Sequence, residues 1–250
     1  MRTRVVVALL SILTCGRALA DTEDLHQFLH SADEATQVTV PLRADGQLEV
    51  DAADGTRRDQ VAVILRPPAD TYVELQKEGI KSVLLSKDGK AYRLAKGAAK
   101  ADDFPLDAGF AGSDFTREDL EPFRMARYKD ARISDLSGAE LTVTLYPDKS
   151  QYSLVVVTFD RDKKVPIKTL YYHDTLNNLV KMERNDGWVL VGRKWLPTTM
   201  SMESFKLKTH STLSLHWSQE ATFPPELFDP VFLTHASGIV WPAAAPTPAP

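Results

Sequence analysis

Cysteine is almost absent from this chain. Its 250 residues contain one, Cys15, in the first twenty residues. The remainder of the chain can form no disulfide and no thiolate metal site, and it has no cysteine nucleophile. It also lacks a phosphate-cradling glycine loop and a Gly-x-Ser-x-Gly nucleophile elbow. These absences argue against a nucleotide-binding protein with a glycine-rich phosphate loop and against a serine hydrolase with a nucleophile elbow.

Long hydrophobic runs are also lacking, except for one at the start. Arg2 and Arg4 precede the apolar residues 5–13, and Ala18-Leu19-Ala20 follows them. That order is typical of a secretory signal peptide. The run is shorter than the roughly 20 apolar residues that span a bilayer. We therefore predict that residues 1–20 are a signal peptide cleaved after Ala20, and that the protein is exported to the periplasm.

Two other interpretations of this segment exist. One is an N-terminal core helix, but no polar residue breaks the apolar run with helical spacing. The other is a lipoprotein that is cut before Cys15 and anchored there. Thr14 fits poorly with the small residue expected before such a lipidated cysteine. Cleavage after Ala20 is therefore the favoured prediction, and it gives a free rather than an anchored protein.

Basic residues do not outnumber acidic ones. The full chain has 30 Lys and Arg against 34 Asp and Glu; without Arg2, Arg4 and Arg17 the count is 27 against 34, a net charge of −7. This excess of negative charge disfavours nucleic acid as a partner, because phosphate binding needs a basic surface. The remaining length suits a single domain over residues 21–241. The Pro/Ala-rich residues 242–250 predict a disordered or extended tail.

Short strand patterns separated by turn signals make up most of the chain. A short helix is expected over residues 24–30, and Thr116 is expected to begin another, with Asp119 three residues later. Ala44-Asp45-Gly46 and Asp54-Gly55 are expected turns. Strands are expected over residues 36–42, 47–50, 61–65, 71–76, 82–85, 91–94, 139–146, 152–160, 165–172, 179–184, 195–205 and 210–217. The fold class predicted is mainly β (α+β), with one large curved antiparallel sheet or half-open β-barrel and short helices covering its concave side.

Residues suited to catalysis or metal binding are present but poorly arranged. His210 and His216 would lie roughly 20 Å apart on one strand, at about 3.3 Å per residue. His26 and His30 have the i, i+4 spacing of metal ligands, but two ligands alone are insufficient. We therefore predict no metal, no cofactor and no enzymatic activity.

Apolar residues alternate along three of the expected strands. Because methionine is flexible and polarizable, a methionine-containing wall suits a ligand of variable shape, such as an acyl chain. Core packing is the alternative for each residue taken singly. A wide curved sheet leaves more space on its concave side than one short helix can fill. As a set, these apolar residues therefore predict a lipid-sized apolar cavity. The residues are Tyr152, Leu154, Val156, Met200, Met202, Leu213, Leu215 and Trp217.

Residues 109–120, with the sequence GFAGSDFTREDL, resemble the Gly-Ser-Asp-Phe-(Ser/Thr)-x-Glu-Asp-Leu signature of the LolA-like family of outer-membrane lipoprotein-sorting proteins. Further similar segments follow in the family's order, at residues 150–157, 165–172, 195–202, 209–213 and 225–228. The resemblance implies a half-open β-barrel whose concave side is covered by helices and a loop. It also implies that Phe110 and Phe115 belong to the loop that covers the cavity.

The function implied is that of a periplasmic carrier, which shields acyl chains of a lipid or lipoprotein for transfer towards the outer membrane. An inner-membrane transporter and an outer-membrane acceptor are the protein partners that this implies. A second hypothesis is an adaptor or sensor domain whose sheet docks a membrane transporter or another protein. A third is a secreted hydrolase that would depend on Ser211 or His173.

Overall fold

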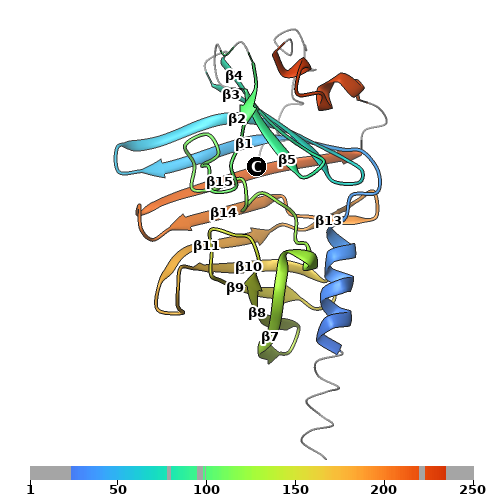
Figure 1. Cartoon of the computed structure of the whole chain (residues 1–250), viewed down its shortest axis with the longest axis vertical. Coiled ribbons are helices and arrows are strands. Elements are labelled where there is room, and N and C mark those ends of the chain that lie inside the picture. The colour runs from blue at the N-terminus through green and yellow to red at the C-terminus, as the bar shows by residue number, and fades with distance from the viewer. Residues whose placement is uncertain (1–23, 78–79, 95–97, 99, 220–222, 235–250) are drawn as a thin grey trace, which may run out of the picture.

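The architecture is one wide antiparallel sheet, seen in a computed structural model that describes residues 24–77, 80–94, 98, 100–219 and 223–234 (Figure 1). The predicted signal peptide and the predicted tail both lie outside these residues. The sheet has 13 strands in the order β6-β5-β4-β3-β2-β1-β15-β14-β11-β10-β9-β8-β7, with β12 and β13 as a separate hairpin. It is curved and is not closed into a barrel. The predicted fold class is confirmed.

The strand boundaries are as follows. The first half contains β1 (Leu42–Ala52), β2 (Gly55–Arg66), β3 (Asp70–Lys77), β4 (Ile80–Lys87), β5 (Lys90–Leu94) and β6 (Asp102–Asp103). The second half contains β7 (Tyr128–Ser137), β8 (Glu140–Pro147), β9 (Leu154–Asp160), β10 (Val165–Tyr172), β11 (Leu179–Asp186), β12 (Val189–Val191), β13 (Lys194–Leu196), β14 (Thr199–Ser204) and β15 (Thr209–Gln219). Three short 3₁₀ helices are η1 (Met125–Arg127), η2 (Pro225–Phe228) and η3 (Phe232–Thr234).

The described part of the N-terminal helix covers residues 24–36, which is longer than predicted. Leu25 and Leu29 on its apolar face are buried in the main core. Phe28 packs edge-on against Phe159 of β9, with ring centroids 5.6 Å apart. The helix therefore covers one end of the concave face (Figure 1). The second expected helix, at Thr116, does not form, because residues 117–120 make a single turn that does not continue.

The expected turn at Ala44-Asp45-Gly46 is also wrong, since β1 runs straight through it. A Cβ atom on Gly46 would lie 1.8 Å from the backbone oxygen of Ser214 on β15. Glycine at this position therefore permits close approach of two strands rather than a turn. The hairpin predicted at Asp54-Gly55 is present one residue earlier, because the loop is Ala53-Asp54 and Gly55 already belongs to β2, paired with Ala52.

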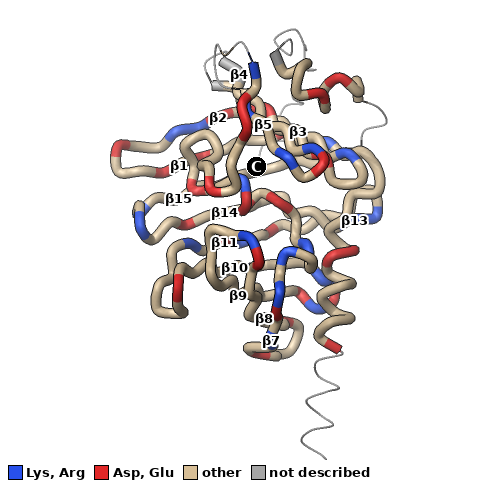
Figure 2. The backbone as a smooth tube through the Cα atoms, in the orientation of Figure 1, with Lys and Arg blue, Asp and Glu red and all other residues tan. Residues whose placement is uncertain are grey.

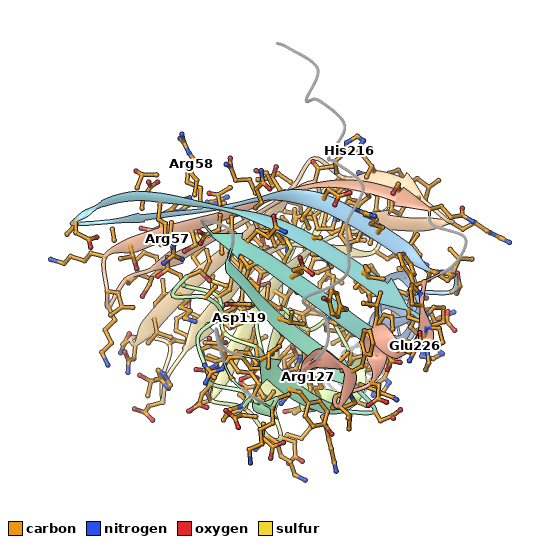
Figure 3. All side chains as sticks on the ribbon, turned by 90° about the horizontal axis from the view of Figure 1, so that it is seen from above. Arg57, Arg58, Asp119, Arg127, His216 and Glu226 are labelled. Carbon is orange, nitrogen blue, oxygen red and sulfur yellow. The ribbon has the colours of Figure 1, made fainter. Side chains whose placement is uncertain are left out.

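Two hydrophobic clusters lie on opposite faces of the sheet. The larger one fills the concave face between the sheet, the N-terminal helix and residues 104–124. The smaller one lies on the outer face, where Leu227 and Phe228 of η2 pack on Ile64, Tyr72 and Leu85. In Figure 3 the sheet forms an arch with Asp119 inside it and His216 on its outer side. The concave face is thus the place to look for a ligand site.

Candidate functional site

A long connection crosses the concave face of the sheet. We call residues 104–124 the lid; they join β6 to η1 and β7, and β6 and β7 are the two opposite edges of the 13-stranded sheet. The lid contains no helix or strand, and its one ladder contact is an isolated bridge between Gly109 and Thr116. Connections of this length without secondary structure are uncommon in compact domains and are often functional lids. Because the chain must pass from one edge to the other, the lid necessarily covers the face between them.

The lid contributes its aromatic side chains to the core. Phe104, Phe110, Phe115 and Phe123 are all buried in the concave cluster, and Phe115 is fully buried. Phe123 stacks edge-on against Phe159, at 5.3 Å between ring centroids. The lid therefore forms part of the core on the concave face.

The structure brings together most of the residues predicted to line the cavity. Phe110, Phe115, Tyr152, Met202, Leu213 and Leu215 belong to the concave cluster, and Met200 and Trp217 are partly buried against it. Leu154 and Val156 do not belong to it. On β9 the neighbouring Val155 and Val157 face the concave cluster instead. Tyr152 precedes β9 and reaches the core from a loop. Alternation counted from Tyr152 therefore selects Leu154 and Val156, which lie on the wrong face of the strand.

Asp114 fastens the middle of the lid to β15. Its backbone N–H donates to Ser211 Oγ at 2.9 Å, and the Ser211 hydroxyl donates to Asp114 Oδ2 at 2.7 Å. The Thr209 hydroxyl donates to the other carboxylate oxygen of Asp114. Ser211 is fully buried, and its hydroxyl is committed to the lid rather than to a histidine. The neighbouring His210 is exposed and contacts Thr212.

Asp119 forms the second and most buried attachment. Its side chain is 0% exposed and accepts a 2.9 Å ion pair from Lys181 Nζ of β11. It also accepts hydrogen bonds from Tyr152 Oη and from the backbone N–H of Thr116, both at 2.8 Å. Lys181 Nζ donates in addition to the backbone oxygen of Asp114, at 2.7 Å. One lysine therefore holds two points of the lid. The sequence analysis placed Asp119 at an expected helix start and in the family signature, and it missed Lys181.

Three further contacts hold the lid on either side of Asp114. Arg127 Nη2 pairs with Glu118 at 3.1 Å, and the backbone N–H of Gln151 donates to the same carboxylate at 3.2 Å. On the other side, Arg57 Nη2 donates to the backbone oxygen of Ala111 at 2.5 Å. We call the contacts of Asp114, Glu118 and Asp119 with the sheet and its loops the latch. Each of these polar residues of the signature motif attaches the lid to the sheet or to its loops.

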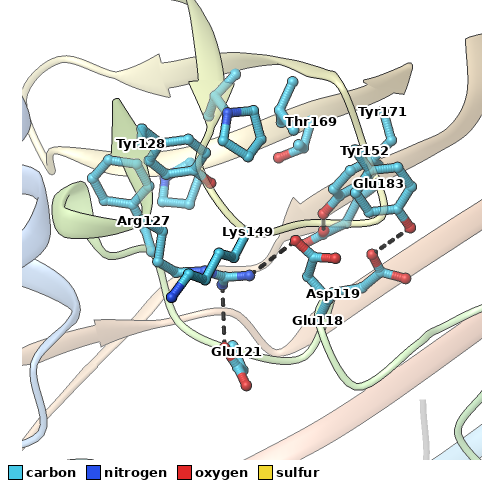
Figure 4. A pocket seen from close by; sticks show the side chains of 15 residues that line it. Glu118, Asp119, Glu121, Arg127, Tyr128, Lys149, Tyr152, Thr169, Tyr171 and Glu183 are labelled. Carbon is cyan, nitrogen blue, oxygen red and sulfur yellow. Dashed lines mark hydrogen bonds and ion pairs between the residues drawn. The ribbon is translucent and has the colours of Figure 1, made fainter. Parts of the chain in front are cut away.

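A small pocket of about 70 Å³ opens beside the latch, between the lid and strands β7 to β11 (Figure 4). Its lining is mixed, with Tyr128, Lys149 and Thr169 as well as latch residues. Ligand pockets usually measure about 300–1,000 Å³, so this one is too small for an acyl chain. This pocket is therefore not the lipid-sized cavity predicted from the sequence, and the lid phenylalanines pack on the concave face instead.

Glu183 of β11 lines this pocket and is buried. Burial raises the pKa of Glu183 to about 7, although hydrogen bonds from Tyr171 and Asn185 act in the opposite direction. These bonds measure 2.5 Å from Tyr171 Oη and 2.8 Å from Asn185 Nδ2. Burial likewise raises the pKa of Tyr152 well above its ordinary value, and the Asp119 charge adds to this effect. Tyr152 therefore acts as a hydrogen-bond donor.

Within the described ranges, no group of three or more His, Cys, Asp or Glu residues is placed to hold a metal ion. In the same part of the chain, no helix is long and apolar enough to cross a membrane.

Comparison with solved structures finds the same fold in other proteins. An outer membrane lipoprotein-sorting protein domain from Vibrio parahaemolyticus superposes with a TM-score of 0.71 at 15% identity, over 83% of this chain and 97% of that one. A LolA superfamily protein from Nitrosomonas europaea gives 0.66 at 15% identity, over 81% and 96%. A DUF1329 family protein from Desulfovibrio piger gives 0.68 at 14% identity, over 81% and 95%.

Sequence comparison adds a family. A search of the curated proteins found no match to this chain. A family model described as "uncharacterized protein" matches residues 102–235, which include the lid and the second half of the sheet. The chain therefore belongs to the family that this model describes, and it has the fold of the LolA-like lipoprotein-sorting proteins that its lid sequence resembles.

Proposed function

We propose that this protein is an exported carrier that shields the acyl chains of a lipid or lipoprotein between its lid and the concave face of its sheet. The observation that carries the proposal is the lid itself, whose four phenylalanines fill an apolar face while its polar side chains hold it shut. Binding would exchange phenyl rings for a hydrocarbon chain. It requires no covalent chemistry and no cofactor.

The exchange has one main gain and two main costs. A chain of about twelve methylenes gains roughly 10 kcal/mol when it leaves water, at about 0.8 kcal/mol per CH₂. Opening the lid loses several buried hydrogen bonds, each worth about 1 kcal/mol net, and exposes the displaced phenylalanines. The Lys181–Asp119 ion pair adds little to this cost, because both charges regain water when the lid opens.

The proposed binding wall consists of residues from two adjacent strands, β14 and β15. Met200 and Met202 lie opposite Leu213 and Ser211, respectively, in the register of these strands. Methionine adapts its shape at small cost and suits chains of different length. Phe110 and Phe115 are the groups that a chain would displace, and Leu215 and Trp217 continue the wall along β15. Leu154 and Val156 are not part of this wall, because Val155 and Val157 are the residues of β9 that face the concave side.

The remaining parts of the proposal concern transport. The protein is exported by residues 1–20 and works in the periplasm as one domain over residues 21–241, followed by the Pro/Ala-rich residues 242–250. An inner-membrane transporter would deliver the cargo and an outer-membrane acceptor would take it. The fold of lipoprotein-sorting proteins supports this assignment.

A reversible lock on the lid tests the proposal. Ser211 Oγ lies 2.9 Å from the backbone nitrogen of Asp114, so cysteines at these two positions are close enough for a disulfide. The double variant Asp114→Cys/Ser211→Cys, made together with Cys15→Ala, would carry no other thiol. We expect the oxidised form to bind a fluorescent fatty acid at least about tenfold more weakly than the same protein after reduction.

A matched control uses a disulfide that does not touch the lid. Gln47 of β1 and Ser214 of β15 are exposed cross-strand partners, and a disulfide between cysteines there should leave uptake unchanged after oxidation and reduction. If the reduced lid variant and the unaltered protein both fail to bind fatty acid, the carrier proposal is wrong. The adaptor hypothesis would then be preferred, and the closed lid would be a permanent part of the core.

A further inference from the structure

Exposed apolar side chains gather at one end of the sheet, next to the lid. Phe205 and Leu207 lie in the turn between β14 and β15 and are 38% and 67% exposed. Leu176, in the loop between β10 and β11, is 61% exposed. The backbone N–H of Phe205 donates to the oxygen of Val180 at 3.1 Å, so the turn and the loop are neighbours. We call residues 173–178 and 205–208 the rim.

Lysines alternate with the apolar residues in the β14–β15 turn. Its sequence is Phe205-Lys206-Leu207-Lys208, and the whole turn is exposed. Among the residues that the structure describes, neither lysine forms a salt bridge. Figure 2 shows this turn as a basic tip at the end of β14 and β15. Two cations beside two apolar side chains match the phosphates and the hydrocarbon of a lipid surface, even though the chain as a whole is acidic.

The rim is also joined to the latch. Thr209, which bonds Asp114 of the lid, directly follows Lys208. Lys181, which bonds both Asp114 and Asp119, lies three residues after the end of the Leu176 loop. Any surface that contacts the rim therefore lies next to the attachment points of the lid.

We propose that the rim docks on the surface of an anionic phospholipid bilayer, with Leu207, Phe205 and Leu176 inserting among the lipids and Lys206 and Lys208 contacting phosphates. This inference rests on the proposed carrier function and adds to it the place where cargo enters and leaves. An acyl chain would pass from the bilayer to the concave face beneath the latched edge of the lid.

Vesicle flotation with the purified protein tests the proposal. Vesicles of phosphatidylglycerol and phosphatidylcholine should carry the protein upward, and vesicles of phosphatidylcholine alone should carry much less. Leu207→Ser should weaken partitioning to the anionic vesicles by about tenfold or more, because the insertion of one leucine is lost. Lys206→Gln/Lys208→Gln should weaken it by about tenfold on anionic vesicles and leave binding to neutral vesicles unchanged.

Leu190→Ser is the matched control. Leu190 is 59% exposed, but β12 follows the far end of β11, so it lies at the opposite end of the sheet from the rim. This variant should float like the unaltered protein. Equal losses for Leu207→Ser and Leu190→Ser would overturn the proposal, as would flotation that does not depend on anionic lipid.

The two proposals fail separately. A protein that takes up fatty acid in solution but does not float overturns membrane docking and leaves the carrier intact; the rim would then be expected to bind a protein. A protein that floats through Leu207 but takes up no fatty acid supports docking and overturns the carrier. Leu207→Ser should leave solution uptake unchanged, because its side chain lies outside the concave cluster.

Discussion

Lys181→Met is the substitution that most directly tests how the lid is held. Methionine keeps the length of the lysine stem and removes the ammonium group. The side chain of Asp119 is then buried, 0% exposed, without a cation. Breaking a buried ion pair by removing one partner typically costs about 3–5 kcal/mol. Asp119 keeps its hydrogen bonds from Tyr152 Oη and Thr116 N, so we expect a loss of about 3 kcal/mol of unfolding free energy.

That loss has a thermal and a functional readout. For a chain of this size, 1 kcal/mol lowers Tm by about 2–4 °C, so we expect a decrease of about 6–12 °C. Because Lys181 holds the lid at two points, the association rate of a fluorescent fatty acid should rise. Lys129→Met, at an exposed position of β7, is the control and should change stability by no more than about 0.5 kcal/mol.

A double-mutant cycle makes the reasoning refutable. In Lys181→Met/Asp119→Asn the uncompensated charge is gone, so the two losses should be less than additive by about 1–3 kcal/mol. Strict additivity, or a Lys181→Met protein as stable as the unaltered one, would show that the ion pair does not hold the lid.

Three other perturbations have defined outcomes. A carboxyl whose pKa is raised on folding stabilises the protein fully only below its unfolded-state pKa. The pKa of the buried Glu183 is raised from 4.5 to about 7, so the free energy of unfolding should fall by about 3 kcal/mol as pH rises across that interval. Chemical unfolding of Glu183→Gln should show no such fall with pH. Phe115→Ala should cost about 3–5 kcal/mol in unfolding free energy and leave a cavity under the lid. Calorimetry should therefore show lower stability of the folded protein but tighter binding of a fatty acid. Gly46→Ala should yield little folded protein on expression, because the new Cβ would overlap the backbone of Ser214; a normal yield would contradict the close approach of β1 and β15.

The sequence predicted the sheet well where strands have one buried face. Residues 165–172 were predicted as a strand and coincide with β10, and the hairpin predicted at Asp54-Gly55 turns one residue earlier, at Ala53-Asp54. Strand β7 was missed, because almost all of its residues are exposed at the edge of the sheet and its sequence shows no apolar alternation. The predicted strand over residues 195–205 is divided, with β13 ending at Leu196 and β14 beginning at Thr199.

The apolar part of the candidate site was easier to predict than the polar part. Met202 and Leu213 follow a two-residue period that is visible in the sequence, and both lie in the concave cluster. The partners of the lid show no such period. Asp114 is 97 residues from Ser211, and Asp119 is 62 residues from Lys181. The sequence analysis named Ser211 as a candidate nucleophile and included it in a family-like segment, but no local rule connects a serine on one strand with an aspartate in a distant loop.

The position of the lid explains why its signature is polar although its task is to cover an apolar face. A segment that joins opposite edges of a sheet must be attached along its length. Phenylalanines alone would not fix its position, because they would pack about equally well on the apolar face in many positions of the segment. Buried hydrogen bonds at Asp114 and Asp119 select one position, because any other leaves their carboxylates without partners. The signature would therefore govern how readily the lid opens. The shape of the accepted chain would depend on the wall, at Met200, Met202 and Leu213, where we expect substitutions to alter chain-length preference without changing the opening rate.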